Sequence, residues 1–215
     1  MGTTIYPGLQ VTAWAIHYVL NEVLKYPISI NDVCVYIPAW FSVLTCLAVF
    51  GMTYEASKSA NAGVAAAAIM AVVPSHIMRS VAGGYDNESI AMAAMCMTFF
   101  LWMRTLRSAQ SWPLGLLTGL SYVYMVAAWG GYIFVLNMIG LHAMFMLVRN
   151  YLPESPVEQD DKKAGTAYSV QLHLGYSLFY IVGTLGAIQF PVVGYVCFFF
   201  LLLLRFFFFF YDFSK

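Results

Sequence analysis

Five long stretches of this chain contain no Asp, Glu, Lys or Arg: residues 33–53, 59–78, 89–103, 108–148 and 164–204. An α-helix rises about 1.5 Å per residue, so about 20 apolar residues cross the roughly 30 Å hydrocarbon core of a bilayer. The two longest stretches are about twice that length. Gly130-Gly131 and Pro191 lie near their middles as turn formers. The pattern predicts membrane-spanning helices, two in each of the longest stretches.

The composition excludes an ordinary water-soluble domain. Of 215 residues, 61% are apolar and 9% are charged, whereas soluble domains have roughly 25% charged residues. We therefore expect an all-α fold, a polytopic transmembrane helix bundle of about six to seven spans. The predicted elements are an amphipathic stretch at 9–25 and spans at 33–53, 60–80, 88–104, 111–128, 132–148 and 168–190, with a doubtful one at 192–211.

The remaining segments indicate little chemistry. Residues 153–165 are polar, of mixed charge and rich in turn formers, which is typical of a flexible cytoplasmic loop. Residues 197–215 form a low-complexity apolar tail of doubtful origin. Four scattered cysteines suit buried thiols. The net charge of zero gives no reason to expect a nucleic-acid partner.

The distribution of cations predicts the orientation of the helices. Alternating the predicted spans across a membrane places six cations on one side: Lys58, Arg104, Arg107, Arg149, Lys162 and Lys163. The positive-inside rule makes that side cytoplasmic. Residues 79–88 and the turns at 129–132 and 189–191 then face the opposite side.

The most informative segment joins two predicted helices at residues 79–88. Arg79, Asp86 and Glu88 meet at this junction, where the following charge-free run is too short to lift Glu88 far above the bilayer. Ionisable groups at such depth mainly persist where they have partners or a function. With Asp86 in a non-helical segment, both carboxylates can turn toward one cation. Hard oxygen ligands favour magnesium or manganese.

A purely structural interpretation of the same residues is favoured when the spacing alone is considered. Asp86 is a suitable N-cap residue, and Glu88 in the first helical turn complements the helix dipole. Asp and Glu routinely begin helices. The spacing therefore leaves both a helix cap and a metal site open.

The segment RSVAGGYDNE at residues 79–88 closely resembles the second acidic motif of eukaryotic oligosaccharyltransferase catalytic subunits. The resemblance continues in TTIYPGL at 3–9, YMVAAWGGY at 124–132, and YIVGTL and QFP at 180–185 and 189–191. It covers about residues 2–195 in order. The chain is thus similar to a central transmembrane part of that glycosyltransferase.

This resemblance implies a function and a site. Asp86 and Glu88 would bind the catalytic divalent metal, manganese or magnesium, and Arg79 would be an arginine important for activity. The implied reaction moves a preassembled oligosaccharide from a dolichyl pyrophosphate donor to asparagine in Asn-x-Ser/Thr sequons. Trp129 and Tyr132 are weak candidates for donor contact, and an aromatic belt at the membrane interface is the favoured interpretation of both.

The resemblance also implies partners, a location and missing parts. The partners would be a lipid-linked oligosaccharide, an acceptor polypeptide, membrane lipids and other oligosaccharyltransferase subunits. The location would be the endoplasmic reticulum membrane, with the acidic motif lumenal. The first acidic motif would precede Gly2, and the acceptor-binding loop and soluble C-terminal domain would follow Tyr195. We therefore expect a partial multi-span transmembrane domain over residues 1–215, inactive alone.

Two other functions compete with this one. An ion- or proton-coupled transporter could use Arg79, Asp86 and Glu88 as a charge relay, but such groups are expected near the bilayer midplane in broken helices, with repeat symmetry. A noncatalytic membrane subunit would predict no clustering of acids with an arginine.

Overall fold

The computed structural model describes residues 6–107, 109–151 and 162–190, which fold into helices joined by short turns. The elements in chain order are α1 (Gly8–Tyr18), the π-helical turn η1 (Val19–Val23), α2 (Ile30–Ser57), α3 (Ala60–Val72), α4 (Pro74–Ser80), α5 (Asn87–Thr105), the 3-10 turn η2 (Ala109–Ser111), α6 (Leu114–Ala128), α7 (Tyr132–Tyr151) and α8 (Lys162–Ile188). The described residues contain no β-strand. The all-α prediction is confirmed.

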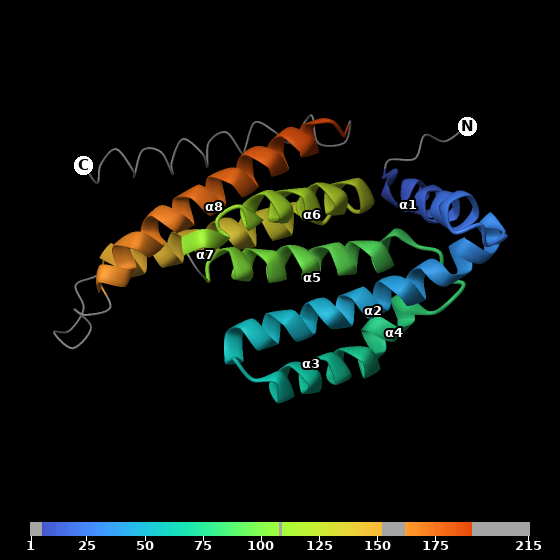
Figure 1. Ribbon diagram of the computed structural model, residues 1–215, viewed down its shortest axis with the longest axis horizontal. Helices are drawn as coiled ribbons and strands as arrows, with labels where there is room; N and C mark the ends of the chain where they lie inside the picture. The colour runs from blue at the N-terminus through green and yellow to red at the C-terminus, as the bar shows by residue number, and fades with distance from the viewer. Residues whose placement is uncertain (1–5, 108, 152–161, 191–215) are drawn as a thin grey trace.

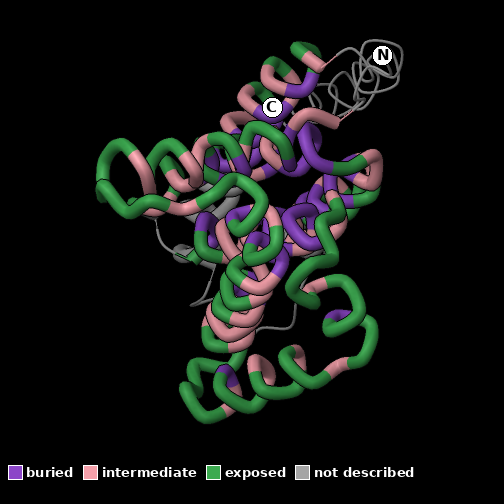
Figure 2. The backbone as a smooth tube through the Cα atoms, turned by 90° about the vertical axis from the view of Figure 1, so that its right-hand side faces the viewer, coloured by how far each residue is buried: buried purple, intermediate pink, exposed green. Residues whose placement is uncertain are grey.

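The helices form a bundle with one hairpin on its side (Figure 1). Helix α6 packs against α5 and α8, and α2 packs along α5. Helices α3 and α4 turn back along the outer side of α2, away from α6 to α8 (Figure 1). Figure 2 shows the buried backbone concentrated in the bundle, whereas the α3 hairpin arm is largely exposed.

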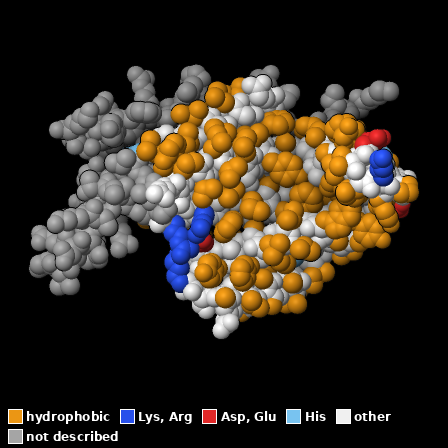
Figure 3. Space-filling model, in the orientation of Figure 1, with side chains coloured by type: hydrophobic (Ala, Val, Ile, Leu, Met, Phe, Trp, Pro, Cys, Tyr) orange, Lys and Arg blue, Asp and Glu red, His pale blue; other side chains and the backbone are white. Residues whose placement is uncertain are grey.

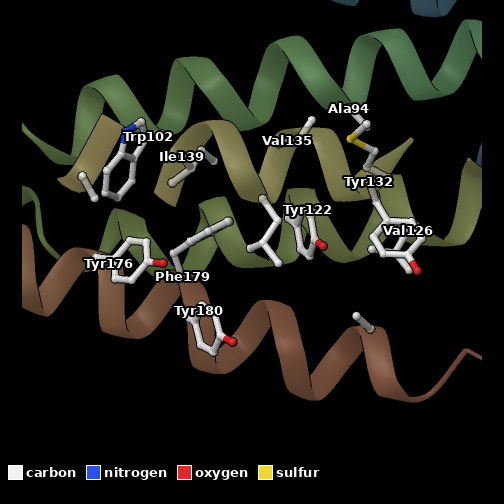
Figure 4. Packing of buried hydrophobic residues seen from close by; sticks show 14 of the residues in the cluster. Ala94, Trp102, Tyr122, Val126, Tyr132, Val135, Ile139, Tyr176, Phe179 and Tyr180 are labelled. Carbon is white, nitrogen blue, oxygen red and sulfur yellow. The ribbon is translucent and has the colours of Figure 1, made fainter. Parts of the chain in front are cut away.

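An aromatic core holds α5, α6, α7 and α8 together. Trp102, Tyr122, Phe179 and Tyr180 are at most 3% exposed, and Figure 4 shows their rings between the helices. The Tyr122 and Phe179 rings meet edge to face with centroids 5.6 Å apart. Because aromatic rings bury large areas and pair specifically, this cluster fixes the relative positions of the four helices.

Small residues bring α6 and α8 unusually close. A Cβ atom on Gly115 would lie 2.6 Å from the Gly175 carbonyl oxygen, and one on Gly119 would lie 2.9 Å from Val182 Cβ. Small residues at crossing points let helix backbones approach closely. The glycines at these positions therefore allow the close contact between α6 and α8, which a larger side chain would prevent.

A second apolar cluster joins the beginnings of α2 and α5 to α1 and the end of α6. Val33, Ile37 and Ile90 are completely buried, with Leu9 and Ala128 beside them. This cluster lies under the junction between α4 and α5. It gives that junction a packed base.

The α2–α3 hairpin is closed by a two-residue turn. Helix α2 begins after Ser29, whose hydroxyl accepts a hydrogen bond from the Asp32 amide, and ends at Lys58 in a left-handed conformation with φ 56°. Ser59 then caps α3 by accepting from the Ala62 amide at 3.4 Å. Serine N-caps satisfy amides that lack partners in the first turn of a helix.

The predicted span at residues 60–80 is not one continuous helix. It is divided at Val73 into α3 and α4, which are bent by 65°. Pro74 at the start of α4 explains the break: it has no N–H to continue the helix, and its ring disfavours the helical conformation of the preceding residue. Val73 accordingly has extended backbone angles, with ψ 123°.

Length and composition identify fewer spans than predicted. Among the described residues, α2 alone is a single helix long and apolar enough to cross a membrane, and α3 with α4 would qualify as a bent pair. Leu114–Ala128, Tyr132–Val148 and His173–Ile188 are apolar but shorter. The count of six to seven spans therefore stays a prediction.

Most of the predicted loop at 153–165 and the apolar tail at 197–215 lie outside the described residues. Helix α8 begins at Lys162, so the last four residues of the predicted loop are helical instead. The predicted loop extended to Gly165 because these residues are polar and include a glycine. A polar first turn does not prevent a helix, so the start of α8 was predicted too late.

Candidate functional site

The site lies in the turn between α4 and α5, which is fastened to the beginning of α2. Helix α4 ends at Ser80, and Gly83 has φ 93°, a conformation that glycine adopts without steric cost. The Gly83 amide donates a hydrogen bond to the Val35 carbonyl at 2.9 Å. The turn therefore has a fixed position relative to α2.

Arg79 joins the two carboxylates predicted for the site. Its Nε lies 2.7 Å from Glu88 Oε2, and its Nη1 lies 3.4 Å from Asp86 Oδ2. Different nitrogens of one planar guanidinium thus contact two different acids, as the geometry of arginine allows. The structure brings together all three residues, Arg79, Asp86 and Glu88, at one helix junction.

The structure agrees with the helix-cap interpretation in position but not in side-chain contact. Asp86 is at the N-cap position of α5, with φ −135° and ψ 149°, but its side chain makes no capping hydrogen bond. Ser89 instead donates its hydroxyl to the Asp86 carbonyl at 3.0 Å. Because the Asp86 carboxylate does not cap the helix, its placement beside Arg79 needs another explanation.

The three charged side chains are accessible, while the helix below them is buried. Arg79, Asp86 and Glu88 side chains are 50%, 53% and 36% exposed, whereas Ile90 and Ala91 in the next turn of α5 are buried. An exposed acidic pair on a packed base can reach a ligand in solution without disturbing the core.

Tyr85 adds a neutral group beside this pair. Burial of its hydroxyl and a hydrogen bond with the Cys34 thiol raise the pKa of Tyr85 to about 12. The phenol therefore stays protonated at neutral pH, and it donates to the Leu9 carbonyl at 3.5 Å. This contact links the turn to α1.

His76 anchors α4, the short helix that carries Arg79. Its ring is 2% exposed, and its Nε2 lies 2.9 Å from the Ser42 hydroxyl of α2. His76 and Arg79 are three residues apart, so they occupy adjacent turns of α4. The prediction from sequence missed this pair, because Ser42 and His76 are separated by a whole helix hairpin.

The donor chemistry of the site fits a hard divalent cation in part. Asp86 and Glu88 offer carboxylate oxygens, which suit magnesium or manganese. No group of three or more His, Cys, Asp or Glu residues gathers within the described ranges. The chain thus offers two protein ligands here, and ions of this type commonly retain several waters or bind substrate phosphates.

The two aromatic candidates differ from each other. Trp129 follows α6 and is 39% exposed, which is compatible with a position at a membrane interface. Tyr132 is 2% exposed and packs edge to face with Tyr122, with centroids 6.4 Å apart. Burial of Tyr132 does not fit a position in a surface belt, and donor contact by Trp129 or Tyr132 stays a prediction.

A comparison with known protein families finds a match across the chain. The family described as "Oligosaccharyl transferase STT3, N-terminal" matches residues 1–215. This chain belongs to the STT3 family. The resemblance carried by residues 79–88 and 124–132 is thereby confirmed.

Curated relatives extend across most of the chain. It is 40% identical over 194 residues to the dolichyl-diphosphooligosaccharide–protein glycosyltransferase subunit stt3 of Schizosaccharomyces pombe, covering 90% of this chain and 23% of the relative. It is 39% identical over 196 residues to the Caenorhabditis elegans subunit, covering 91% and 23%. The Oryza sativa subunit STT3A is 41% identical over 195 residues, covering 91% and 22%. The chain therefore spans about a quarter of the length of these STT3 relatives.

Proposed function

We propose that this chain forms part of an enzyme that transfers a preassembled oligosaccharide from a dolichyl pyrophosphate donor to asparagine in acceptor polypeptides. The single observation that carries the proposal is the Arg79–Asp86–Glu88 cluster at the α4–α5 junction, within a chain of the STT3 family. The relatives in Schizosaccharomyces pombe and Caenorhabditis elegans are named dolichyl-diphosphooligosaccharide–protein glycosyltransferase subunits. The transporter hypothesis has no support from the family or from these charges, which lie at a helix junction.

Asp86 and Glu88 would hold a magnesium or manganese ion in this proposal. The ion would act as a Lewis acid that neutralises charge on the departing pyrophosphate. Arg79 contacts both carboxylates, so its role is to set their separation and to limit their mutual repulsion. The hydrogen bond from Gly83 to Val35 and the Ser42–His76 contact would keep that arrangement in place.

The surface of the protein supports a membrane location. Large apolar side chains are exposed on the outer helices, among them Val43 at 60%, Leu47 at 59% and Ile69 at 63%. Figure 3 shows a broad hydrophobic face, with the charged side chains gathered toward its two ends. Contiguous apolar surface of this kind is typical of contact with a membrane or a partner. We place the chain in the endoplasmic reticulum membrane as a multi-pass segment, with the Arg79 site on the lumenal side.

A chimera tests the proposal. The chain would replace the matching segment of the full-length Schizosaccharomyces pombe relative, and transfer from a lipid-linked oligosaccharide to an Asn-x-Thr peptide would be measured during a manganese titration. Asp86→Asn and Glu88→Gln should each lower transfer at least tenfold and raise the manganese concentration needed for activity, because each removes one anionic ligand.

The matched control is Glu22→Gln, an acid in the η1 turn that should leave transfer and manganese dependence unchanged. Asparagine is as good an N-cap as aspartate, so Asp86→Asn also separates the proposed metal role from helix capping. Wild-type transfer and manganese dependence in both site variants would refute the metal role of this pair.

A further inference from the structure

A second charged cluster lies at the other end of α2 and is built around one buried acid. The Glu55 side chain is only 7% exposed. Arg104 Nη1 lies 2.6 Å from Glu55 Oε1, Lys58 Nζ lies 3.3 Å from Glu55 Oε2, and Arg107 donates to the same Oε2. One carboxylate thus gathers three cations from α2, the end of α5 and the turn that follows α5.

The cluster carries more positive charge than its buried acid neutralises. In the described part of the chain, Glu55 is the acidic partner of all three cations, which leaves a surplus of two positive charges. Lys58, Arg104 and Arg107 side chains remain 54%, 44% and 36% exposed. Their other N–H groups can therefore meet an anion from outside, and a guanidinium pair suits the oxygens of a phosphate.

Glu55 makes this cationic surface a built site rather than a group of solvated side chains. Removing a carboxylate from water is costly unless it is well paired, so its burial requires the cations to stay close. Glu55 consequently holds three mutually repelling cations together before any ligand arrives. Figure 3 shows Lys and Arg side chains gathered around an acidic spot near the ends of α2 and α5.

The position of the cluster identifies the source of the anion. The 23 residues that separate Asp32 from Glu55 in α2 span about 34 Å, close to the roughly 30 Å thickness of a hydrocarbon core. If α2 crosses the membrane, Glu55 lies near the phosphates of the leaflet opposite the Arg79 site. Exposed apolar side chains of the same helix lie deeper: Leu47 is about two turns and Val43 about three turns from Glu55. Such a surface would suit the acyl chains of a lipid whose headgroup lies at the cluster.

We propose that Lys58, Arg104 and Arg107, organised by Glu55, bind the phosphate of an anionic phospholipid in the leaflet opposite the proposed catalytic junction. Basic clusters between membrane helices recognise anionic headgroups by this chemistry. The inference depends on the membrane location proposed above, but not on the transfer reaction. A free phosphate ion shares the headgroup chemistry, and the experiment below distinguishes the two sources.

The experiment measures lipid retention by the chimeric full-length protein reconstituted in phosphatidylcholine bilayers that contain phosphatidylinositol. Protein is extracted in mild detergent, and the two co-purifying lipids are quantified by mass spectrometry. The wild-type protein should enrich phosphatidylinositol. Arg104→Gln and Arg107→Gln should each reduce the enrichment by roughly fivefold, as expected for one cation near an anionic surface. Lys25→Gln, which removes an exposed cation elsewhere, is the control and should leave it unchanged.

Glu55→Gln distinguishes ligand binding from a purely structural ion network. It keeps all three cations but removes the negative charge that holds them together, so phosphatidylinositol enrichment should fall toward that of the triple variant described below. An ion network that binds no lipid would leave the enrichment unchanged. The triple variant Glu55→Gln/Arg104→Gln/Arg107→Gln leaves no unpaired buried acid and should fold while losing the enrichment.

Three outcomes would overturn the proposal. They are equal enrichment in the wild-type protein and the triple variant, unchanged or higher enrichment in Glu55→Gln, and complete displacement of phosphatidylinositol by inorganic phosphate at a matched concentration. The last result would assign the site to free phosphate. Glycan transfer is measured on the same samples, so failure of the lipid site and failure of the proposed transfer function give different readouts.

Discussion

Replacing Arg79 by lysine tests the geometry of the α4–α5 junction while keeping its charge. Arg79 reaches Glu88 through Nε at 2.7 Å and Asp86 through Nη1 at 3.4 Å. A lysine ammonium is a single point of charge on a flexible chain and cannot reproduce these two fixed contacts. Arg79→Lys should therefore leave at least one carboxylate free to change its position.

The expected magnitudes separate stability from activity. Exposed ion pairs contribute about 0.2–1 kcal/mol each, and these groups are a third to a half exposed, so screening puts the loss of stability at the low end of that range. Transfer should fall at least tenfold, because a shift of about 1 Å in a group that positions the reaction can cost about 100-fold.

The assay is peptide glycosylation by the chimera, with thermal unfolding measured on the same preparation. Lys25→Arg is the control, since it exchanges the same two side chains in the reverse direction at an exposed residue outside the α4–α5 junction. Unchanged transfer in Arg79→Lys would refute the argument that the two-point contact sets the carboxylates. A large fall in unfolding temperature would instead assign Arg79 a structural role.

Two further predictions concern packing and topology. Gly115→Ala should destabilise the protein by about 1–3 kcal/mol, because the new Cβ would lie 2.6 Å from the Gly175 carbonyl oxygen. The control Gly140→Ala meets only the Tyr176 hydroxyl at 3.5 Å and should be nearly neutral. Thermal unfolding of both variants in detergent checks this, and equal unfolding temperatures would contradict the close contact between α6 and α8. Cysteines placed at Ser80 or Gly84 should react with an impermeant reagent only from the lumenal side of microsomes, and labelling from the cytosolic side would overturn the proposed orientation.

Charge gaps predicted the helices well where a boundary coincided with a charge or a turn former. Residues 132–148 are helical within α7, and the predicted start at Glu88 is one residue from the observed start of α5. The break at Pro74 was missed, because counting charges gives the length of an apolar run and does not show whether the run forms one unbroken helix. The signal was present in the proline itself, which disfavours a helical conformation in the residue before it.

The candidate site was predictable as a group of residues but not as a set of contacts. Arg79, Asp86 and Glu88 lie within ten residues of one another, so their proximity follows from one turn. Glu55 and Arg104 are 49 positions apart, and only the antiparallel packing of α3 and the return through α5 brings them together. The burial of Tyr132 likewise depends on α6 and α7 meeting, which its aromatic character does not reveal.

The bend at Val73 makes the position of Arg79 depend on the angle between α3 and α4. About 7.5 Å of helix separates Pro74 from Arg79, so a change of about 10° in the 65° bend would move the Arg79 backbone by roughly 1.3 Å. That displacement is about half the 2.7 Å contact between Arg79 and Glu88. The bend before Pro74 therefore determines where the Arg79 guanidinium lies relative to Glu88. The Ser42–His76 hydrogen bond between α2 and α4 limits changes in that bend.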